Sequence, residues 1–214
     1  MLPRLKRHPG RARRGLRAIG LLLAGVAAAA GLPAEQTDTV RQLIARLPEP
    51  AVHAARLHSA ADYRRTLLEV YDRHHDALLW SSAGAATAPA RALLELLQAA
   101  PAYGLSADDY DAERLAAQLR TLDAASDATA GQWAAFDVAL SSAAVTLLHD
   151  LHFGRIDPHA VGFDLPRRRD RFDAAAYLED LTLRTDAAAV VAEVEPDFLH
   201  YRLLRQPLAR YRQL

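Results

Sequence analysis

The residues of this chain that could carry out chemistry gather on one long apolar segment. Asp137 lies there among aromatic neighbours, and a carboxylate in such surroundings can act as a general base. We favour a structural interpretation, in which Asp137 is the partner of a nearby arginine. Ser141 and Ser142 follow on the same segment, without the flanking glycines of a nucleophile elbow and without an evident triad. The segment therefore predicts no assembled catalytic site.

Two histidine-rich runs have the donor atoms of a metal site without its spacing. His149, Asp150 and His152 place two imidazoles at neighbouring helix positions, and the run at 74–76 is similar. Neither run has the intervening glutamate and the third ligand of the known helical zinc motif. Packing at a helix end and compensation of the helix dipole explain His149 and His152 better. We therefore assign no catalytic, cofactor-binding or metal-binding residue and no cofactor.

A short charged loop, Phe153 to Pro158, follows the apolar segment. Gly154 suits the left-handed turn that ends many helices, and Pro158 prevents the helix from resuming. Arg155 and Asp157 stand two residues apart and can tie this loop to neighbouring helix ends. The loop thus predicts a helix end held by charged side chains.

One long helix must position these groups. Its apolar residues recur every three or four positions and so share one face: Trp133, Phe136, Leu140, Ala144, Leu147 and Leu151. This is the longest apolar face in the chain, which predicts a central core helix over 133–153. The aromatic residues at helical spacing, Tyr71 and Trp80 among them, are interpreted as core rather than as a ligand platform.

The other patterns also predict helices. Short helices are expected over 37–47, 172–184 and 186–194. Capping boxes predict two more helix starts, at Ser59 with Asp62 and at Ser106 with Asp109. A further helix is expected from Thr87 and Pro89 to Pro101 and Gly104, and a last one from Pro196, with Tyr201, Leu204, Leu208 and Tyr211 spaced three or four apart. Residues 81–88 and 123–130 are expected to be a loop and a linker. No stretch alternates like a strand, so we predict an all-α fold, a single compact domain of about seven to nine short helices.

Composition narrows the function classes. The chain of 214 residues has no cysteine, which excludes a thiol nucleophile, a disulfide and a cysteine-based metal site. Its formal net charge of +0 is unevenly distributed, because the first 17 residues hold seven basic residues and no acid. The remainder is acidic, and an acidic body lacks the clustered positive charge that phosphate contacts need. We therefore expect no nucleic-acid partner.

The N-terminal residues 1–34 are typical of an export signal. A basic stretch precedes an apolar run from Ala18 to Ala30, and small residues follow before the first acid at Glu35. This run is short for a spanning helix, which needs roughly 20 residues. We expect a signal peptide or N-terminal anchor over 1–34, a linker with a short helix over 35–53, and a periplasmic body. Membrane contact is expected only if the N-terminal segment is retained.

Several islands along the chain match one family in order. They are Tyr71 with Leu78-Leu79-Trp80, Tyr103-Gly104-Leu105, Asp108-Asp109-Tyr110, Phe136-Asp137-Val138-Ala139-Leu140-Ser141, Leu151 to Pro158, and Tyr201-Arg202-Leu203-Leu204 with Leu208-Ala209-Arg210-Tyr211. Together they resemble the N-terminal helical scaffold domain of large murein L,D-transpeptidases, over roughly residues 54–214. The run from Leu151 to Pro158 is the most specific of these islands.

The resemblance implies an all-α scaffold beside a catalytic domain whose cysteine thiolate forms an acyl-enzyme with a stem peptide. This chain has no cysteine, so that chemistry is not transferred to any residue here. We expect a non-catalytic scaffold whose partners are an L,D-transpeptidase catalytic domain or peptidoglycan. An independent periplasmic adaptor that binds peptidoglycan or a partner protein is the alternative, and an enzyme using Asp137 or Asp157 is a third. Whether the chain is a natural stand-alone scaffold, a truncated product or a fragment stays open.

Overall fold

The computed structural model describes residues 34–48, 60–156, 161–164 and 172–211. These residues form eight α-helices, two short 3-10 helices and one small hairpin: α1 (Ala34–Arg46), α2 (Ala60–Arg73), β1 (Ser81–Ser82), β2 (Ala85–Ala86), α3 (Ala88–Gln98), η2 (Ala100–Tyr103), η3 (Ala107–Tyr110), α4 (Ala112–Ala124), α5 (Ala130–Phe153), α6 (Ala174–Leu183), α7 (Ala187–Val194) and α8 (Leu199–Tyr211). The predicted all-α fold is confirmed. The expectations for Ser59, Asp157, Pro158 and the export signal lie outside the described residues.

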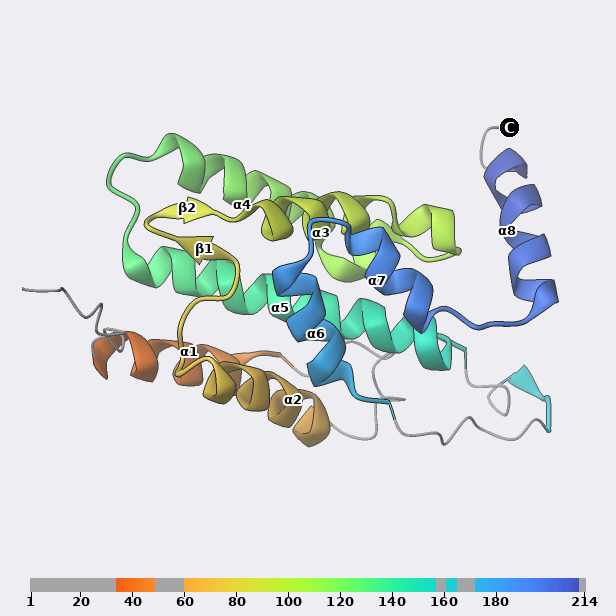
Figure 1. The fold of residues 1–214 in the computed structure, drawn as a ribbon, viewed down its shortest axis with the longest axis horizontal. Coiled ribbons are helices and arrows are strands. Elements are labelled where there is room, and N and C mark those ends of the chain that lie inside the picture. The colour runs from red at the N-terminus through yellow and green to blue at the C-terminus, as the bar shows by residue number, and fades with distance from the viewer. Residues whose placement is uncertain (1–33, 49–59, 157–160, 165–171, 212–214) are drawn as a thin grey trace, which may run out of the picture. The chain divides into compact units, whose positions relative to one another are not determined.

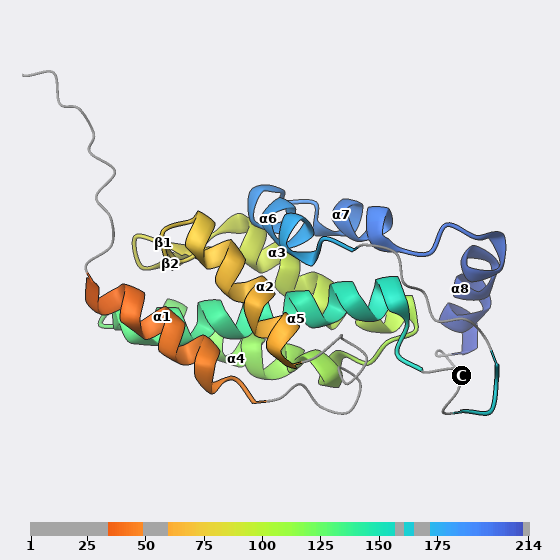
Figure 2. The same cartoon turned by 90° about the horizontal axis from the view of Figure 1, so that it is seen from below.

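The helix α5 is the centre of the helical body, as predicted. It packs against α1, α2, α3, α4, α6 and α7, which surround it in both views (Figures 1 and 2). The whole predicted stripe is buried, and so are residues on the other faces of the helix, including Ala134, Val138, Val145 and Leu148. By length and composition α5 could cross a membrane, but 72% of its most apolar window is buried inside this body. It is therefore the core helix of this body, with one partly exposed stripe through Ala139 and Thr146.

The ends of the helices follow from local sequence. Thr129 begins α5 with a capping box, in which its side chain accepts from the Gln132 amide and Gln132 binds back to the Thr129 amide. Thr87 caps α3 as predicted, and it accepts a hydrogen bond from the Ala90 amide at 3.2 Å. The predicted end of that helix at Pro101 and Gly104 is only partly right: α3 ends at Gln98, Pro101 lies in the 3-10 helix η2, and Gly104 ends η2 in a left-handed conformation with φ 82°.

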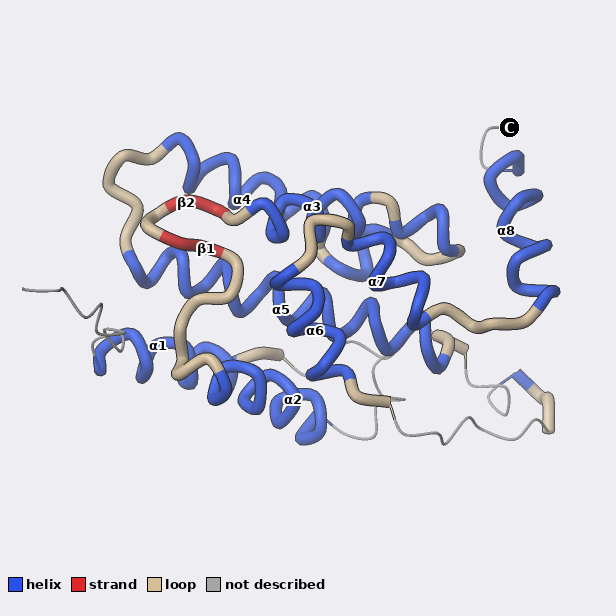
Figure 3. The backbone as a smooth tube through the Cα atoms, in the orientation of Figure 1, coloured by secondary structure: helices blue, strands red, loops and turns tan. Residues whose placement is uncertain are grey.

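The region predicted as a loop at 81–88 contains a small antiparallel hairpin (Figure 3). Ser81 pairs with Ala86, and the turn between the strands places Ala83 and Gly84 at positive φ. Each strand has only two residues, which is too short for alternation to be visible in the sequence. The hairpin leads from the buried Trp80 to the start of α3.

The second predicted capping signature, Ser106 with Asp109, is wrong. Ser106 precedes the 3-10 helix η3, but its side chain makes no capping hydrogen bond. Asp109 pairs instead with Arg155, which lies beyond the end of α5. A separate helix, α4, starts only after Asp111, a residue at φ 51°.

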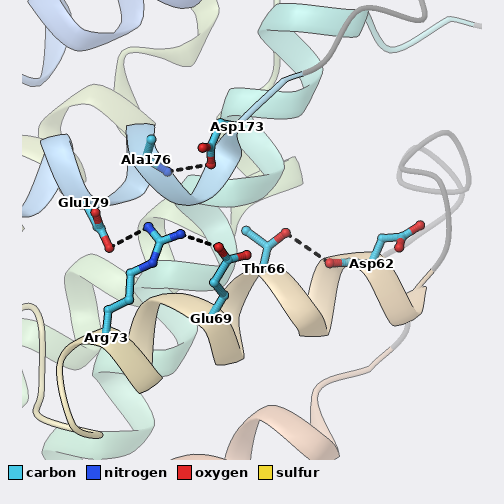
Figure 4. Close-up of polar contacts among 7 residues, drawn as sticks. All are labelled: Asp62, Thr66, Glu69, Arg73, Asp173, Ala176 and Glu179. Atoms are coloured by element: carbon cyan, nitrogen blue, oxygen red, sulfur yellow. Dashed lines mark hydrogen bonds and ion pairs between the residues drawn. The ribbon is translucent and has the colours of Figure 1, made fainter.

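The helices α2 and α6 are joined by charged side chains (Figure 4). Arg73 near the end of α2 contacts Glu69 on its own helix and Glu179 of α6, the latter at 2.9 Å. Asp173 caps α6 by accepting from the Ala176 amide at 3.0 Å. These groups fix where α6 begins and which face it turns toward α2.

The helix α8 packs on η2 rather than on α5. The predicted last helix is confirmed, although it begins at Leu199 rather than at Pro196, and its four regularly spaced side chains are not equally buried. Tyr201 and Leu208 are half-buried, whereas Leu204 is 69% exposed and Tyr211 is 74% exposed.

Candidate functional site

Asp137 lies at a buried polar centre between α5 and the segment that enters the hairpin. Its side chain has 0% exposure. One carboxylate oxygen accepts from the Tyr71 hydroxyl at 2.7 Å and from the Leu79 amide at 2.9 Å, and the other accepts from the Trp80 amide at 2.7 Å. The carboxylate thus satisfies three buried donors that come from outside its own helix.

Ser141 lies one turn along α5 and completes the same network. Its hydroxyl accepts from the Trp80 indole at 2.8 Å and lies 3.0 Å from the Tyr71 hydroxyl. The next serine, Ser142, is hydrogen-bonded to Tyr63 of α2. Both serines therefore hold aromatic residues in place, and neither faces a histidine base in these contacts.

The Asp137 carboxyl has a perturbed acidity. Burial raises its pKa to about 6, although the hydrogen bonds from Tyr71 and the two backbone amides act in the opposite direction. Burial also raises the pKa of Tyr71 well above its usual value, and the neighbouring Asp137 adds to that rise. Tyr71 therefore remains a hydroxyl donor at neutral pH.

This arrangement is unsuited to general-base catalysis. A base must reach the proton that it abstracts, and Asp137 is enclosed on every side. Our prediction of an arginine partner is also wrong, because the hydrogen-bond donors to Asp137 are a phenol and backbone amides. The reason is physical: amides of a chain turn fit inside a dry core, whereas a guanidinium carries further donors that would need partners there.

A second polar centre lies at the other end of α5. Asp150 accepts from the buried Tyr110 hydroxyl at 2.8 Å, and the Arg155 guanidinium lies 4.0 Å from the same carboxylate. Arg155 also pairs with Asp109 of η3. The predicted role of Arg155 in holding the loop is confirmed, and its partners are the end of α5 and η3.

Gly154 ends α5 in a conformation different from the predicted one. Its φ is positive at 79°, but its ψ of 157° places it in the mirror image of the extended region rather than in the left-handed turn. That region is open essentially to glycine alone. The chain therefore leaves α5 in an extended direction, and Arg155 follows within reach of η3.

The histidines at the end of α5 pack in an aromatic cluster. The His152 ring stacks on Phe172 at 4.1 Å between centroids, and Phe172 stacks on Tyr177 at 5.4 Å. His149 meets Phe172 edge-on at 5.4 Å and stacks on Phe153. The predicted packing role of both histidines is confirmed, and it joins α5 to the start of α6.

The run at 74–76 forms the turn that ends α2. His75 and Asp76 have positive φ, and Asp76 accepts hydrogen bonds at 3.2 and 3.3 Å from Arg41 of α1. Within the described part of the chain, no group of three or more His, Cys, Asp or Glu side chains could hold a metal ion.

Sequence reasoning missed the partners that make these centres. Tyr63, Tyr110 and the indole of Trp80 each place one polar atom in an otherwise apolar core. Their signal was present, since a buried Tyr or Trp usually needs a hydrogen-bond partner. Their partners on α5 are Ser142 for Tyr63, Asp150 for Tyr110 and Ser141 for the Trp80 indole.

Comparison with known proteins agrees with this architecture. A family model described as the scaffold domain matches residues 65–208, which is most of the described helical body. The chain belongs to the scaffold-domain family. No curated protein and no solved structure matches it.

The scaffold-domain match runs from the first half of α2 into α8, and it includes both polar centres. The resemblance to a scaffold domain is thereby confirmed. The helical body extends beyond the matched range at its start, because α1 packs on α5 and buries Val40 and Ile44.

Proposed function

We propose that this chain is an exported, non-catalytic scaffold that positions an L,D-transpeptidase catalytic module or its cell-wall substrate for murein crosslinking. Membership of the scaffold-domain family over residues 65–208 is the observation that carries the proposal. The absence of cysteine from the sequence supports a role in which a second polypeptide or domain supplies the nucleophile.

The hydrogen bonds of the polar side chains on α5 agree with such a role. Asp137, Ser141, Ser142 and Asp150 each hydrogen-bond to a residue of another segment of the body. These contacts stabilise the relative placement of helices, which is what a scaffold needs. They leave no nucleophile next to a base, which acyl transfer from a stem peptide would require.

The test uses the purified full chain, a cysteine-bearing L,D-transpeptidase catalytic domain and muropeptides with tetrapeptide stems. Mass spectrometry measures the crosslinked product. We expect none from the chain alone, and more product from the catalytic domain with the chain than without it. A catalytic domain with its cysteine replaced by alanine, and a heat-denatured sample of the chain, are the controls.

The outcomes separate the alternatives. Crosslinked product from the chain alone would overturn the non-catalytic assignment and return attention to Asp137 and Ser141. Binding of the chain to isolated sacculi, with no effect on the catalytic domain, would favour an independent adaptor. Cell fractionation tests the export step, and an unprocessed chain confined to the cytoplasm would contradict it.

A further inference from the structure

The helix α8 presents an outward apolar face, and its inward face is fixed to the body. Glu195 accepts hydrogen bonds at 2.7 Å from both the Tyr201 hydroxyl and the Arg205 guanidinium. The Arg205 guanidinium also lies 4.6 Å from the centre of the Tyr103 ring of η2. Leu208 packs beside Gly104, so closely that a Cβ added to this glycine would lie 3.6 Å from the leucine side chain. The orientation of α8 on the body is therefore defined.

Large apolar side chains of α8 lie in solvent on its opposite face and on one flank. Leu199 is 59% exposed, Leu203 is 54% exposed and Leu204 is 69% exposed, with Tyr211 at the end of the helix. Phe198, just before the helix, is exposed as well. At 100° per residue, Leu199 and Leu203 lie close together, opposite the half-buried Tyr201 and Arg205. Leu204 and Tyr211 lie together about 100° further round, on a flank of the helix. Clustered exposed apolar side chains of this kind mark an interaction surface.

The charge on α8 indicates which partner fits this face. The helix contains Arg202, Arg205 and Arg210 and no acidic residue. Arg202 has one partner, the exposed Asp197 at 3.2 Å, and Arg210 is exposed. Beyond its first 17 residues the chain is acidic as a whole, so α8 differs in charge from the body that carries it. Apolar side chains flanked by arginines, with a tyrosine beside them, suit an anionic bilayer surface, where arginine stems extend to the headgroups.

We propose that α8 lies on an anionic membrane surface, with Leu199, Leu203 and Leu204 in the interface and Arg202 and Arg210 at the lipid headgroups. The acidic body is repelled by the same surface, so the contact would orient the body as well as attach it. The proposal is independent of the crosslinking role, since it rests on the exposed side chains of α8 and concerns a different ligand.

The test exploits the absence of cysteine, because one introduced cysteine takes a fluorescent label at a single site. Full-length Leu203→Cys and Leu204→Cys carry a polarity-sensitive dye, and Leu183→Cys is the matched control. Leu183 is a still more exposed leucine at 76%, at the end of α6, and α7 separates it from α8 in the chain. Far-UV circular dichroism checks the fold of each variant. Vesicles contain either phosphatidylglycerol with phosphatidylethanolamine or phosphatidylcholine alone.

With anionic vesicles we expect the emission of the labels at 203 and 204 to shift to the blue and to be quenched by a doxyl group in the lipid. The label at 183 should remain water-like. Arg202→Gln with Arg210→Gln, in the Leu203→Cys chain, should reduce the shift, and so should high salt. The site-specific label reports on α8 even if the N-terminal segment itself attaches the chain to vesicles.

Several results would overturn the proposal. One is a chain that sediments with vesicles while the labels at 203 and 204 stay water-like, and another is a chain that does not bind vesicles at all. A blue shift without vesicles that grows with protein concentration would identify a second copy as the occupant of the face. A shift seen only on addition of the catalytic domain would identify a protein partner. Equal shifts at 183 and 203 would exclude a specific role for α8.

Discussion

Asp137 illustrates how side chains with catalytic potential serve structure in this protein. Its carboxylate binds two backbone amides and a phenol in a region with no exposure. From the sequence, an aspartate on an apolar helix could be recognised as unusual. Its partners could not be recognised, because Leu79 is 58 positions and Tyr71 is 66 positions away along the chain. Only the packing of α2 and the hairpin entry against α5 brings them together.

Replacing Asp137 with alanine should strongly destabilise the fold. The amides of Leu79 and Trp80 and the Tyr71 hydroxyl would lose a buried acceptor, and each unsatisfied group costs about 1–3 kcal/mol. We expect a loss of about 3 kcal/mol or more in the free energy of unfolding, measured by denaturant titration. Asp197→Ala is the control, since that side chain is 91% exposed, and it should change stability by less than about 0.5 kcal/mol.

The raised pKa of Asp137 predicts a pH dependence with a definite sign. Its pKa is about 6 in the folded protein against 3.8 for an ordinary aspartate, so the folded state binds the proton more tightly than the unfolded state. The stabilisation by the neutral form is therefore complete below about pH 4 and is lost as pH rises through about 6. The wild type should lose roughly 3 kcal/mol relative to Asp137→Asn between pH 4 and pH 7, because each pKa unit corresponds to about 1.4 kcal/mol. A stability difference that stays constant over this range in denaturant titrations would contradict the assignment.

At the scale of elements, α5 determines the architecture and was also the easiest element to predict. Its stripe and its end were visible because apolar residues recur at helical spacing over 24 residues. The spacing does not say how far the other faces of α5 are buried, and most of them are, apart from the partly exposed stripe through Ala139 and Thr146. The same limit applies at α8, where the regular spacing of Leu204 and Tyr211 does not reveal that both side chains are exposed.

Truncating a buried leucine of α5 should be costly. Leu140 and Leu147 have 0% exposure, and either Leu140→Ala or Leu147→Ala should lower the free energy of unfolding by about 2–5 kcal/mol. The control is Leu183→Ala on the exposed end of α6, with a change below about 0.5 kcal/mol. An effect of either α5 variant below about 1 kcal/mol in a two-state titration would show that this helix is not the core.

Gly154 and Gly131 offer a matched pair on one helix. Gly154→Val should destabilise by about 1–3 kcal/mol, because the positive φ of this position is strained for valine. The effect would come from the backbone and not from a clash, since no atom lies within 4 Å of an added Cβ. Gly131 lies in the first turn of α5 without positive φ, so Gly131→Ala should stabilise by about 0.4–1 kcal/mol. Thermal unfolding measures both. An unchanged melting temperature for Gly154→Val would rule out the strained helix end.

At the scale of the whole molecule, the folding unit is larger than the range matched by the family. The helix α1 lies before residue 65, yet Ile44 is 1% exposed and α1 packs on α5. The sequence predicted this helix from its closing proline but not its packing. A thirteen-residue helix with few apolar residues gives no indication of where in the body it packs.

Ile44→Ala in the full chain should therefore lower the free energy of unfolding by about 2–5 kcal/mol, as expected for a core position. Gln42→Ala, on the exposed face of the same helix, is the control. Equal and small effects of the two variants in denaturant titration would show that α1 is an appendage to the scaffold-domain body.

The two amides held by Asp137 have a consequence for motion. Leu79 and Trp80 belong to no helix or strand, yet their N–H groups point into the core and are bound there. Hydrogen exchange at such amides requires the carboxylate to be released, and α5 cannot release it without separating from its neighbours. We therefore expect the Leu79 and Trp80 amides to exchange only when the whole body unfolds, like those of the core, and not through opening of an independent loop.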